Sequence, residues 1–297
     1  MKLPNRKLPM ELAMTAHGRM IYLANDMYQG GGMKAQGIYS PAETHFLRSI
    51  FKPDWICIDG GCNHGIFTVE MLKHCEHVIA IDPQPLMIDL VKMNVILNNL
   101  LNKCSIVFGA LGATEYIQEV LACNYETFNN FGAYSIQREG PENAVRYKIP
   151  VTTIDKLIEL CKVPRVDFIK LDVEGMELDA LIGASGTIEK FKPTMFIECD
   201  KEDKSFDLMT HIESLGYDMY WVRSLMYDPD NPFNCSIEDN PFGNATNFNL
   251  YCVPCGGDGR GLIKAHPTDD VTTCKTTELC RYGLAGEYDP SKISASY

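Results

Sequence analysis

The sequence predicts an α/β fold with a mainly parallel sheet. Short apolar runs of strand length alternate along the chain with segments of helical periodicity, and this order is typical of βαβ units. Several of the apolar runs end in acidic residues, at the end of a strand where open α/β sheets bind ligands. The chain has 297 residues, of which 45% are apolar and 22% charged, so it is long enough to bury a core.

The first half of the chain supplies three expected strands, at 55–59, 77–82 and 104–108. A glycine-rich turn and a helix over 65–75 separate the first two of them. The next expected helix, 85–101, has apolar residues at spacings of three and four, which places them on one buried face. These residues are Leu86, Leu90, Met93, Leu97 and Leu101.

The second half repeats the alternation after an irregular stretch over 113–144. A helix is expected from about Thr152, because Asp155 three residues later resembles a capping box. A polar loop over 228–247 is long enough to suggest a functional role. The remaining strands are expected at 145–151, 166–172, 194–199, 217–222 and 248–253, and the remaining helices at 175–182 and 206–215.

Charge and hydropathy exclude several classes of protein. The 27 basic and 39 acidic residues give a net charge of −12, which disfavours a general nucleic-acid binder and a binder of anionic membranes. No apolar run is long enough for a membrane-spanning helix. Pro4, Pro9 and Glu11 interrupt what would have to be the apolar part of an export signal, so we expect a cytoplasmic protein.

The twelve cysteines are spread over the chain, several of them in strand-like runs. A secreted disulfide framework would be denser and shorter, so we expect reduced and mostly buried thiols. Four cysteines near the end, at 252, 255, 274 and 280, are spaced too widely in their second pair for a zinc ribbon.

A glycine-rich turn follows the first strand and opens a helix, the context of a nucleotide-binding turn. Cys62 stands where the dinucleotide fingerprint GxGxxG needs its second glycine, so a pyrophosphate ligand is disfavoured. Asp59, Gly61 and Gly65 instead suit a ligand with an ammonium and a carboxylate group. Asp59 could reach the amino-acid end, Gly61 permits close approach of the backbone, and the helix start near Gly65 offers free N–H groups.

The second strand ends in Asp82, 17 residues after Gly65. A carboxylate at this place can accept hydrogen bonds from both hydroxyls of a ribose. The alternative is that the turn is only a tight connection and that Asp82 caps the following helix. Together, and in this strand–helix context, the two features favour an adenosine-containing ligand.

These residues carry a resemblance to a known family. The runs IDGGCNHGIFT and VIAIDPQP resemble the core of class I methyltransferases, which use S-adenosylmethionine. The later runs VTTIDKLIE, VDFIKLDVEGMELDALIGA, MFIE and NPFGNATNFNLYCVP resemble the FkbM family in particular. The resemblance implies a Rossmann-like, seven-stranded, mainly parallel sheet with helices on both faces. It also implies an N-terminal extension over 1–35, a methyltransferase domain over 36–254 and a C-terminal tail over 255–297.

The resemblance also assigns the cofactor, S-adenosylmethionine, to particular residues. Asp59, Gly61, Asn63 and Gly65 would line its methionine end, Asp82 would bind its ribose, and Ala110, within 109–111, would lie beside its adenine. Tyr39 and Glu43 precede the first strand and could cover the cofactor, although Tyr39 could equally serve packing. His64, within the turn, is expected to face solvent.

Three carboxylates are candidates for catalysis. Asp172, Glu174 and Glu198 lie at or near the carboxyl ends of two predicted strands, where they could converge. Crowded carboxylates raise one another's pKa, which would let one act as a general base near neutral pH. The alternative is that Glu174 caps a helix and Glu198 orients the backbone. Asp172 and Glu198 could bind Mg²⁺, but no third ligand is evident, so no metal is predicted.

The resemblance implies O-methylation of a hydroxyl on a sugar, glycan or secondary metabolite, hence a small-molecule or carbohydrate acceptor. The segments 125–147 and 228–247 are the candidates for shaping the acceptor pocket. One alternative is a nicotinamide-dependent oxidoreductase, which the failed GxGxxG disfavours. Another is a binding module that holds S-adenosylmethionine without catalysis. The sequence does not determine the oligomeric state.

Overall fold

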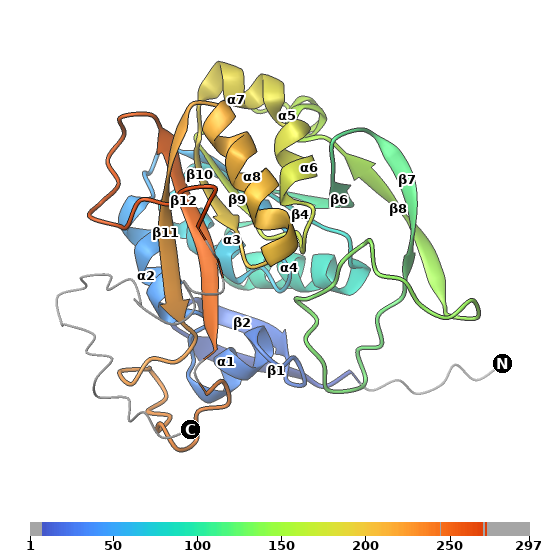
Figure 1. Ribbon diagram of the computed structural model, residues 1–297. Coiled ribbons are helices and arrows are strands. Elements are labelled where there is room, and N and C mark those ends of the chain that lie inside the picture. Colours follow the sequence, from blue (N-terminus) through green and yellow to red (C-terminus); the bar gives the residue numbers. More distant parts are fainter. Residues whose placement is uncertain (1–7, 244, 270, 272–297) are drawn as a thin grey trace.

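The computed structural model describes residues 8–243, 245–269 and 271. A seven-stranded sheet lies at its centre, with strand order β11-β12-β10-β9-β3-β4-β5 (Figure 1). Only β12 runs against the other strands of this sheet. The strands are β3 (Ile56–Gly60), β4 (His77–Asp82), β5 (Cys104–Phe108), β9 (Phe168–Leu171), β10 (Thr194–Glu198), β11 (Tyr217–Leu225) and β12 (Thr246–Pro254). The predicted α/β fold with a mainly parallel sheet is therefore confirmed.

Helices cover both faces of this sheet, because successive strand residues point to opposite sides. Ile58 and Ile169 belong to one buried cluster, together with residues of α5 (Ile154–Cys161), α6 (Glu177–Ile182), α7 (Ser185–Phe191) and α8 (Glu202–Ser214). Their neighbours Cys57 and Phe168 belong to a second cluster on the other face. That cluster contains residues of α2 (Pro41–Ile50), α3 (Ile66–His74) and α4 (Pro85–Leu97).

A separate three-stranded sheet has the order β6-β8-β7, and its first strand comes directly after β5 along the chain. It consists of β6 (Ala110–Leu111), β7 (Tyr116–Leu121) and β8 (Arg146–Thr152). The strand expected at 145–151 is therefore present. The expectation of an irregular stretch over 113–144 is wrong for β7, which pairs antiparallel with β8 along its whole length. That pairing is a contact between distant residues, so local periodicity did not reveal it.

Two expectations about helix starts need correction. Helix α5 begins at Ile154, and its cap is Thr153, whose hydroxyl accepts a hydrogen bond from the Lys156 N–H at 3.1 Å. The predicted capping box of Thr152 with Asp155 is therefore wrong. The Asp155 carboxylate instead accepts hydrogen bonds from the N–H groups of Gly186 and Thr187. It caps α7, a helix that the sequence analysis did not identify.

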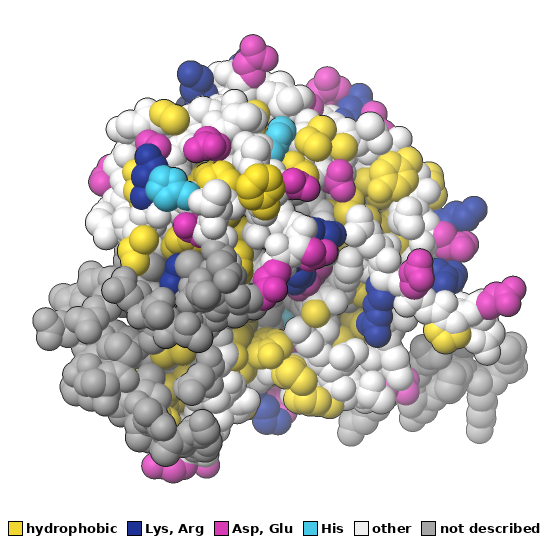
Figure 2. Space-filling view, in the orientation of Figure 1, with side chains coloured by type: hydrophobic (Ala, Val, Ile, Leu, Met, Phe, Trp, Pro, Cys, Tyr) yellow, Lys and Arg dark blue, Asp and Glu magenta, His cyan; other side chains and the backbone are white. Residues whose placement is uncertain are grey.

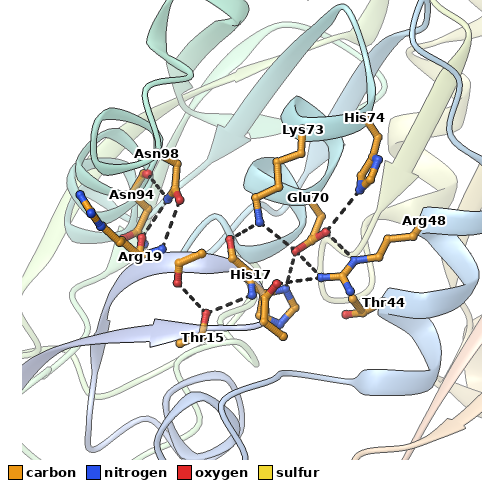
Figure 3. A network of polar contacts seen from close by, with 12 residues as sticks. Thr15, His17, Arg19, Thr44, Arg48, Glu70, Lys73, His74, Asn94 and Asn98 are labelled. Atoms are coloured by element: carbon orange, nitrogen blue, oxygen red, sulfur yellow. Dashed lines mark hydrogen bonds and ion pairs between the residues drawn. The ribbon is translucent and has the colours of Figure 1, made fainter. Parts of the chain in front are cut away.

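The N-terminal segment forms a hairpin and two helices. The hairpin consists of β1 (Met10–Thr15) and β2 (Gly18–Leu23), and the helix after it is α1 (Gln29–Ala35). Asn94 of α4 fastens β2 by donating to the carbonyl of Ile21 and accepting from its N–H (2.9 and 2.7 Å). Asn98, one turn later, makes the same pair of contacts with Arg19. The hairpin is thus attached to the core by the side chains of Asn94 on α4 and of Asn98, the C-cap of this helix; Figure 3 shows the contacts of Asn98 with Arg19.

No helix in the described ranges is long and apolar enough to cross a membrane. Every cysteine in these ranges is free, and two of the buried ones, Cys57 and Cys252, lie in strands of the main sheet. Cys274 and Cys280, considered above in relation to a zinc site, lie outside the described residues.

Candidate functional site

A cavity of about 280 Å³ opens at the carboxyl ends of the parallel strands. Its walls come from the segments that follow β3, β4, β5, β9 and β10. The chain adds β4 and β5 on one side of β3, and β9 and β10 on the other side. This change of direction leaves a crevice beside β3, and open α/β sheets bind their ligands in such a crevice.

The glycine turn brings the backbone close to the end of β9, the neighbour of β3 in the sheet. Gly61 has a φ of +77°, which favours glycine, and a Cβ atom there would lie 1.8 Å from the carbonyl oxygen of Asp172. Gly61 and Asn63 both line the cavity, whereas Gly65 is not in its wall. At Gly65 (φ +79°), a Cβ atom would come within 3.1 Å of Val91 on α4. The first glycine thus shapes the cavity, and the second allows the helices to pack closely.

Asp59 lies behind the cavity wall and is almost completely buried. Its Oδ2 accepts a hydrogen bond from the Thr68 hydroxyl at 2.6 Å, while its Oδ1 is buried and has no partner among the residues that the structure describes. Burial raises the pKa of Asp59, although the nearby Lys170 ammonium opposes this effect. The Oδ1 of Asn63 is also buried without a partner. Asn63 lines the cavity and could accept a hydrogen bond from a ligand there, whereas Asp59 lies behind the wall.

Asp82 faces the cavity from the end of β4 and is buried. Its Oδ2 accepts a hydrogen bond from the Asn63 N–H (2.9 Å), and its Oδ1 accepts one from the Gln84 N–H (2.8 Å). Burial raises the pKa of Asp82 to about 7. The carboxylate therefore orders the glycine turn and the start of α4 (Pro85–Leu97), and it also faces the cavity. A structural role for Asp82 at the start of α4 and a role in binding a ribose are therefore compatible.

The segment that follows β5 lines the same part of the cavity. Gly109, Ala110 and Leu111 all contribute to its wall. Residues from 130–136, within the stretch that the sequence analysis assigned to the acceptor pocket, also line it. Parts of the other predicted acceptor segment, 228–247, contribute as well, at 245–247.

The three candidate catalytic carboxylates converge in the cavity. Asp172, Glu174 and Glu198 each offer an oxygen atom, and these oxygens all lie within 4.8 Å of one another. The Oε2 of Glu198 is buried and has no hydrogen-bond partner in the described part of the chain. Burial, and then the charges of Asp172 and Glu174, raise the pKa of Glu198 well above its ordinary value. Burial and Asp172 also raise the pKa of Glu174, to about 7.

Two lysines compensate part of this negative charge. Lys170 of β9 donates to Asp172 at 3.0 Å, and Lys201 forms an ion pair with Glu174 at 3.0 Å. Acidic and basic side chains also stand close together near the centre of the surface drawn in Figure 2. The helix-capping role considered for Glu174 is wrong, because the N-cap of α6 is Met176 and no side chain caps this helix. The carboxylate of Glu177, the first residue of α6, instead accepts hydrogen bonds from the N–H groups of Val173 and Gly175 and orders the preceding loop.

Lys170 is the main residue that the sequence analysis missed. Its side chain is only 1% exposed, whereas lysines are rarely buried to this extent. Burial alone would lower its pKa, but Asp172, Asp59 and Glu43 outweigh that effect and raise it. A lysine within the apolar run VDFIKLD is unusual in a buried strand, and this was the available signal.

The N-terminal segment completes the cavity. Tyr39 and Glu43, which the sequence analysis considered as covering residues, both line it, and so does Gln29. The expectation that His64 faces solvent is wrong, because this side chain is fully buried. Its Nε2 accepts a hydrogen bond from the Leu23 N–H at 3.3 Å, so it binds the hairpin to the glycine turn.

One family model and several solved structures are similar to the chain. A model of the methyltransferase FkbM domain matches residues 59–219, more than half of the chain. Among solved structures, a methyltransferase FkbM from Methylobacillus flagellatus KT is 18% identical, with a TM-score of 0.44, over 70% of this chain and 50% of that chain. The present chain therefore covers half the length of that protein.

Two further structures are similar at lower identity. A putative methyltransferase from Streptococcus mutans, in complex with SAH, is 10% identical, with a TM-score of 0.42, over 72% of this chain and 96% of that one. Trm5b from Pyrococcus abyssi is 11% identical, with a TM-score of 0.45, over 84% of this chain and 57% of that one. No curated protein matches the chain.

Proposed function

The chain belongs to the FkbM methyltransferase family, whose cofactor is S-adenosylmethionine, and from this premise we propose that it is an O-methyltransferase. The acceptor that we propose is a hydroxyl of a sugar, a glycan or a secondary metabolite. The observation that carries the proposal is the position of Glu198. This partly exposed side chain lines the same cavity as the glycine turn and Asp82, and its buried Oε2 has no hydrogen-bond partner among the described residues.

The residues present fit the cofactor. At Gly61, which lines the cavity, even a Cβ atom would lie 1.8 Å from the Asp172 carbonyl oxygen, so glycine allows the turn to approach the end of β9. The buried, unpartnered oxygens of Asp59 and Asn63 require hydrogen-bond donors. We propose that Asp59, Gly61, Asn63 and Gly65 form the region of the methionine end.

We propose that the opposite end of the cofactor lies at the ends of β4 and β5. Asp82 would accept hydrogen bonds from the ribose hydroxyls, since each of its oxygens has only one backbone donor and a carboxylate oxygen can accept more than one. Ala110, with its neighbours 109 and 111, would lie beside the adenine.

The proposed chemistry is a direct displacement. The cofactor supplies an activated methyl group on a sulfonium, so the protein has to align the acceptor and remove a proton. Glu198 would accept the proton of the acceptor hydroxyl, because its raised pKa gives it more basicity than an ordinary carboxylate. Asp172 and Glu174 would hold the acceptor and keep the pKa of Glu198 high. We propose no metal for this step.

We also propose a cytoplasmic location. The cysteines of the described residues support it, since all of them are free and free thiols suit a reducing compartment.

The test of the proposed function is calorimetric titration of the purified protein with S-adenosylhomocysteine, with NAD and NADP in parallel. We expect micromolar binding of S-adenosylhomocysteine and none of the nicotinamide cofactors. Binding of NAD or NADP alone would overturn the proposal. A screen of hydroxylated acceptors, followed by the release of S-adenosylhomocysteine, then separates an enzyme from a module that only binds the cofactor.

A further inference from the structure

Glu43 is a buried carboxylate in the cavity wall, and it lies outside the segment that the family model matches. It belongs to α2 and is 3% exposed. Its Oε2 accepts hydrogen bonds from the Ser40 hydroxyl (2.8 Å) and from the Asn247 side-chain amide (3.0 Å). Asn247 also donates to the Ser40 hydroxyl at 2.9 Å. These contacts join α2 to β12 and hold the carboxylate in one orientation.

The second oxygen of this carboxylate is open. Oε1 has no hydrogen-bond partner within the described part of the chain, whereas Oε2 has two. Glu43 lines the cavity together with Gly61 and Asp172. A fixed carboxylate with one open oxygen in a cavity is suited to bind a cationic group, because hydrogen bonds between charged partners are about twice as strong as neutral ones.

Among the described residues, Lys170 compensates the charge of Glu43 only in part, because it also interacts with other carboxylates. Lys170 is the cation that interacts with Glu43, Asp59 and Asp172, so three carboxylates share one ammonium group. Burial raises the pKa of Glu43, and the charge of Asp172 adds to this effect. A buried carboxylate without a full counter-charge is unfavourable. A second ammonium group in the cavity would therefore stabilise the ionised form of Glu43.

We propose that Glu43 binds the α-ammonium group of the methionine end of S-adenosylmethionine. The inference rests on the proposed function, which places the methionine end beside Gly61. The N-terminal segment, through Glu43, is then part of the cofactor site rather than an appendage of the domain. The ion pair of Arg48 on α2 with Glu70 on α3 (2.7 Å) would hold α2, and with it this carboxylate, in place.

The alternative is that Glu43 only joins α2 to β12. The substitution Glu43→Gln separates the two roles. The glutamine oxygen can still accept the hydrogen bonds from Ser40 and Asn247, but the negative charge is lost. Glu189→Gln is the matched control, because Glu189 is an exposed glutamate on α7.

The experiment compares two ligands by calorimetry. S-Adenosylhomocysteine has the α-ammonium group, and 5′-methylthioadenosine lacks the amino-acid end. We expect Glu43→Gln to weaken binding of S-adenosylhomocysteine by at least about tenfold, the range for a lost charged hydrogen bond. Binding of 5′-methylthioadenosine should be unchanged, and the control variant should bind both ligands as the native protein does. Equal losses for both ligands, or none, would overturn the inference.

A second measurement keeps the test valid if Glu43→Gln does not fold, which circular dichroism would reveal. The variant is then Ser40→Ala, which keeps the charge of Glu43 but removes one of the hydrogen bonds that orient it. The native protein and Ser40→Ala are each titrated with S-adenosylhomocysteine and with its analogue that lacks only the α-amino group. The losses of binding free energy caused by Ser40→Ala and by the missing amino group should be less than additive when the two changes are combined. Full additivity would contradict the inference. Failure of the native protein to bind S-adenosylhomocysteine at all would instead refute the proposed function.

Discussion

The Nδ1 atom of His17 lies 2.9 Å from Oε1 of Glu70, and both side chains are buried. The Nε2 atom of His17 accepts a hydrogen bond from the Tyr39 N–H at 3.0 Å, so Nδ1 carries the proton that points to Glu70. Arg48 adds two hydrogen bonds to Glu70, at 2.7 and 2.8 Å (Figure 3). Glu70 therefore joins α3, the helix that follows the glycine turn, to the hairpin and to α2.

Replacing Glu70 by glutamine should destabilise the protein strongly. Removal of one partner from a buried ion pair costs about 3 kcal/mol, because the other partners lose their counter-charge. We expect the free energy of unfolding in urea to fall by about this amount for Glu70→Gln. The control is Glu159→Gln, whose exposed ion pair with Lys156 should contribute less than about 1 kcal/mol. Equal effects of the two substitutions would contradict the assigned role of Glu70.

The same network predicts a loss of stability in acid. Burial would raise the pKa of Glu70, but the hydrogen bonds from Arg48 and His17 outweigh it and lower the pKa below its ordinary value of 4.5. A group with a lowered pKa stabilises the folded state above its unfolded pKa, and this contribution disappears as the pH falls. The difference in unfolding free energy between the native protein and Glu70→Gln should therefore shrink below about pH 4.5. A constant difference down to pH 3 would refute this assignment.

Replacing Gly61 by alanine should abolish binding of S-adenosylhomocysteine. The new Cβ atom would lie 1.8 Å from the Asp172 carbonyl oxygen, so the end of β9 has to move. The control is Gly216→Ala, since Gly216 has a φ of +80° and open space around its Cβ position. That variant should lose only the roughly 1–2 kcal/mol of a left-handed backbone and keep its ligand affinity. Calorimetry and urea unfolding measure both quantities; normal affinity in Gly61→Ala would argue against the assigned cofactor site.

Asp82 should make cofactor affinity depend on pH. Burial raises its pKa from 3.8 to about 7, and only the ionised form can accept hydrogen bonds from both ribose hydroxyls at full strength. We expect the affinity for S-adenosylhomocysteine to increase between pH 6 and pH 8, and this increase to disappear in Asp82→Asn. Without ligand, the raised pKa has the opposite sign for stability. The contribution of Asp82 is fully present below pH 3.8 and is lost as the pH rises through about 7.

Thermal unfolding without ligand checks this sign. The melting temperature of Asp82→Asn, relative to the native protein, should rise between pH 5 and pH 8. A relative melting temperature that stays constant or falls would show that Asp82 remains ionised in the folded protein.

Replacing Glu198 by glutamine should separate catalysis from cofactor binding. Loss of a general base lowers kcat by about 10²–10⁴-fold, while the affinity for S-adenosylhomocysteine should change by less than about threefold. The rate of S-adenosylhomocysteine release with an identified acceptor measures kcat, and Glu189→Gln again serves as the control. An unchanged kcat would transfer the role of base to another group.

The sequence was sufficient for the sheet and for the polar ends of its strands. The strands at 77–82 and 104–108 were predicted with the bounds that the structure has. Asp82, Asp172 and Glu198 were predicted at the ends of strands, and all three face one cavity. This was possible because a strand's apolar period and the residue that follows it are local properties, and parallel strands end at one edge of a sheet.

Only the tertiary structure decided the environment of these groups. It buried His64 and Lys170, brought Glu43 into the cavity wall, and left Oε2 of Glu198 without a partner. Each of these results depends on contacts between segments far apart in the chain, such as Glu43 of α2 with Asn247 of β12. The charge and pKa of a carboxyl group depend on burial and on neighbours within a few ångströms. The sequence alone therefore determined which groups could act, and packing determined which of them are buried, paired or open.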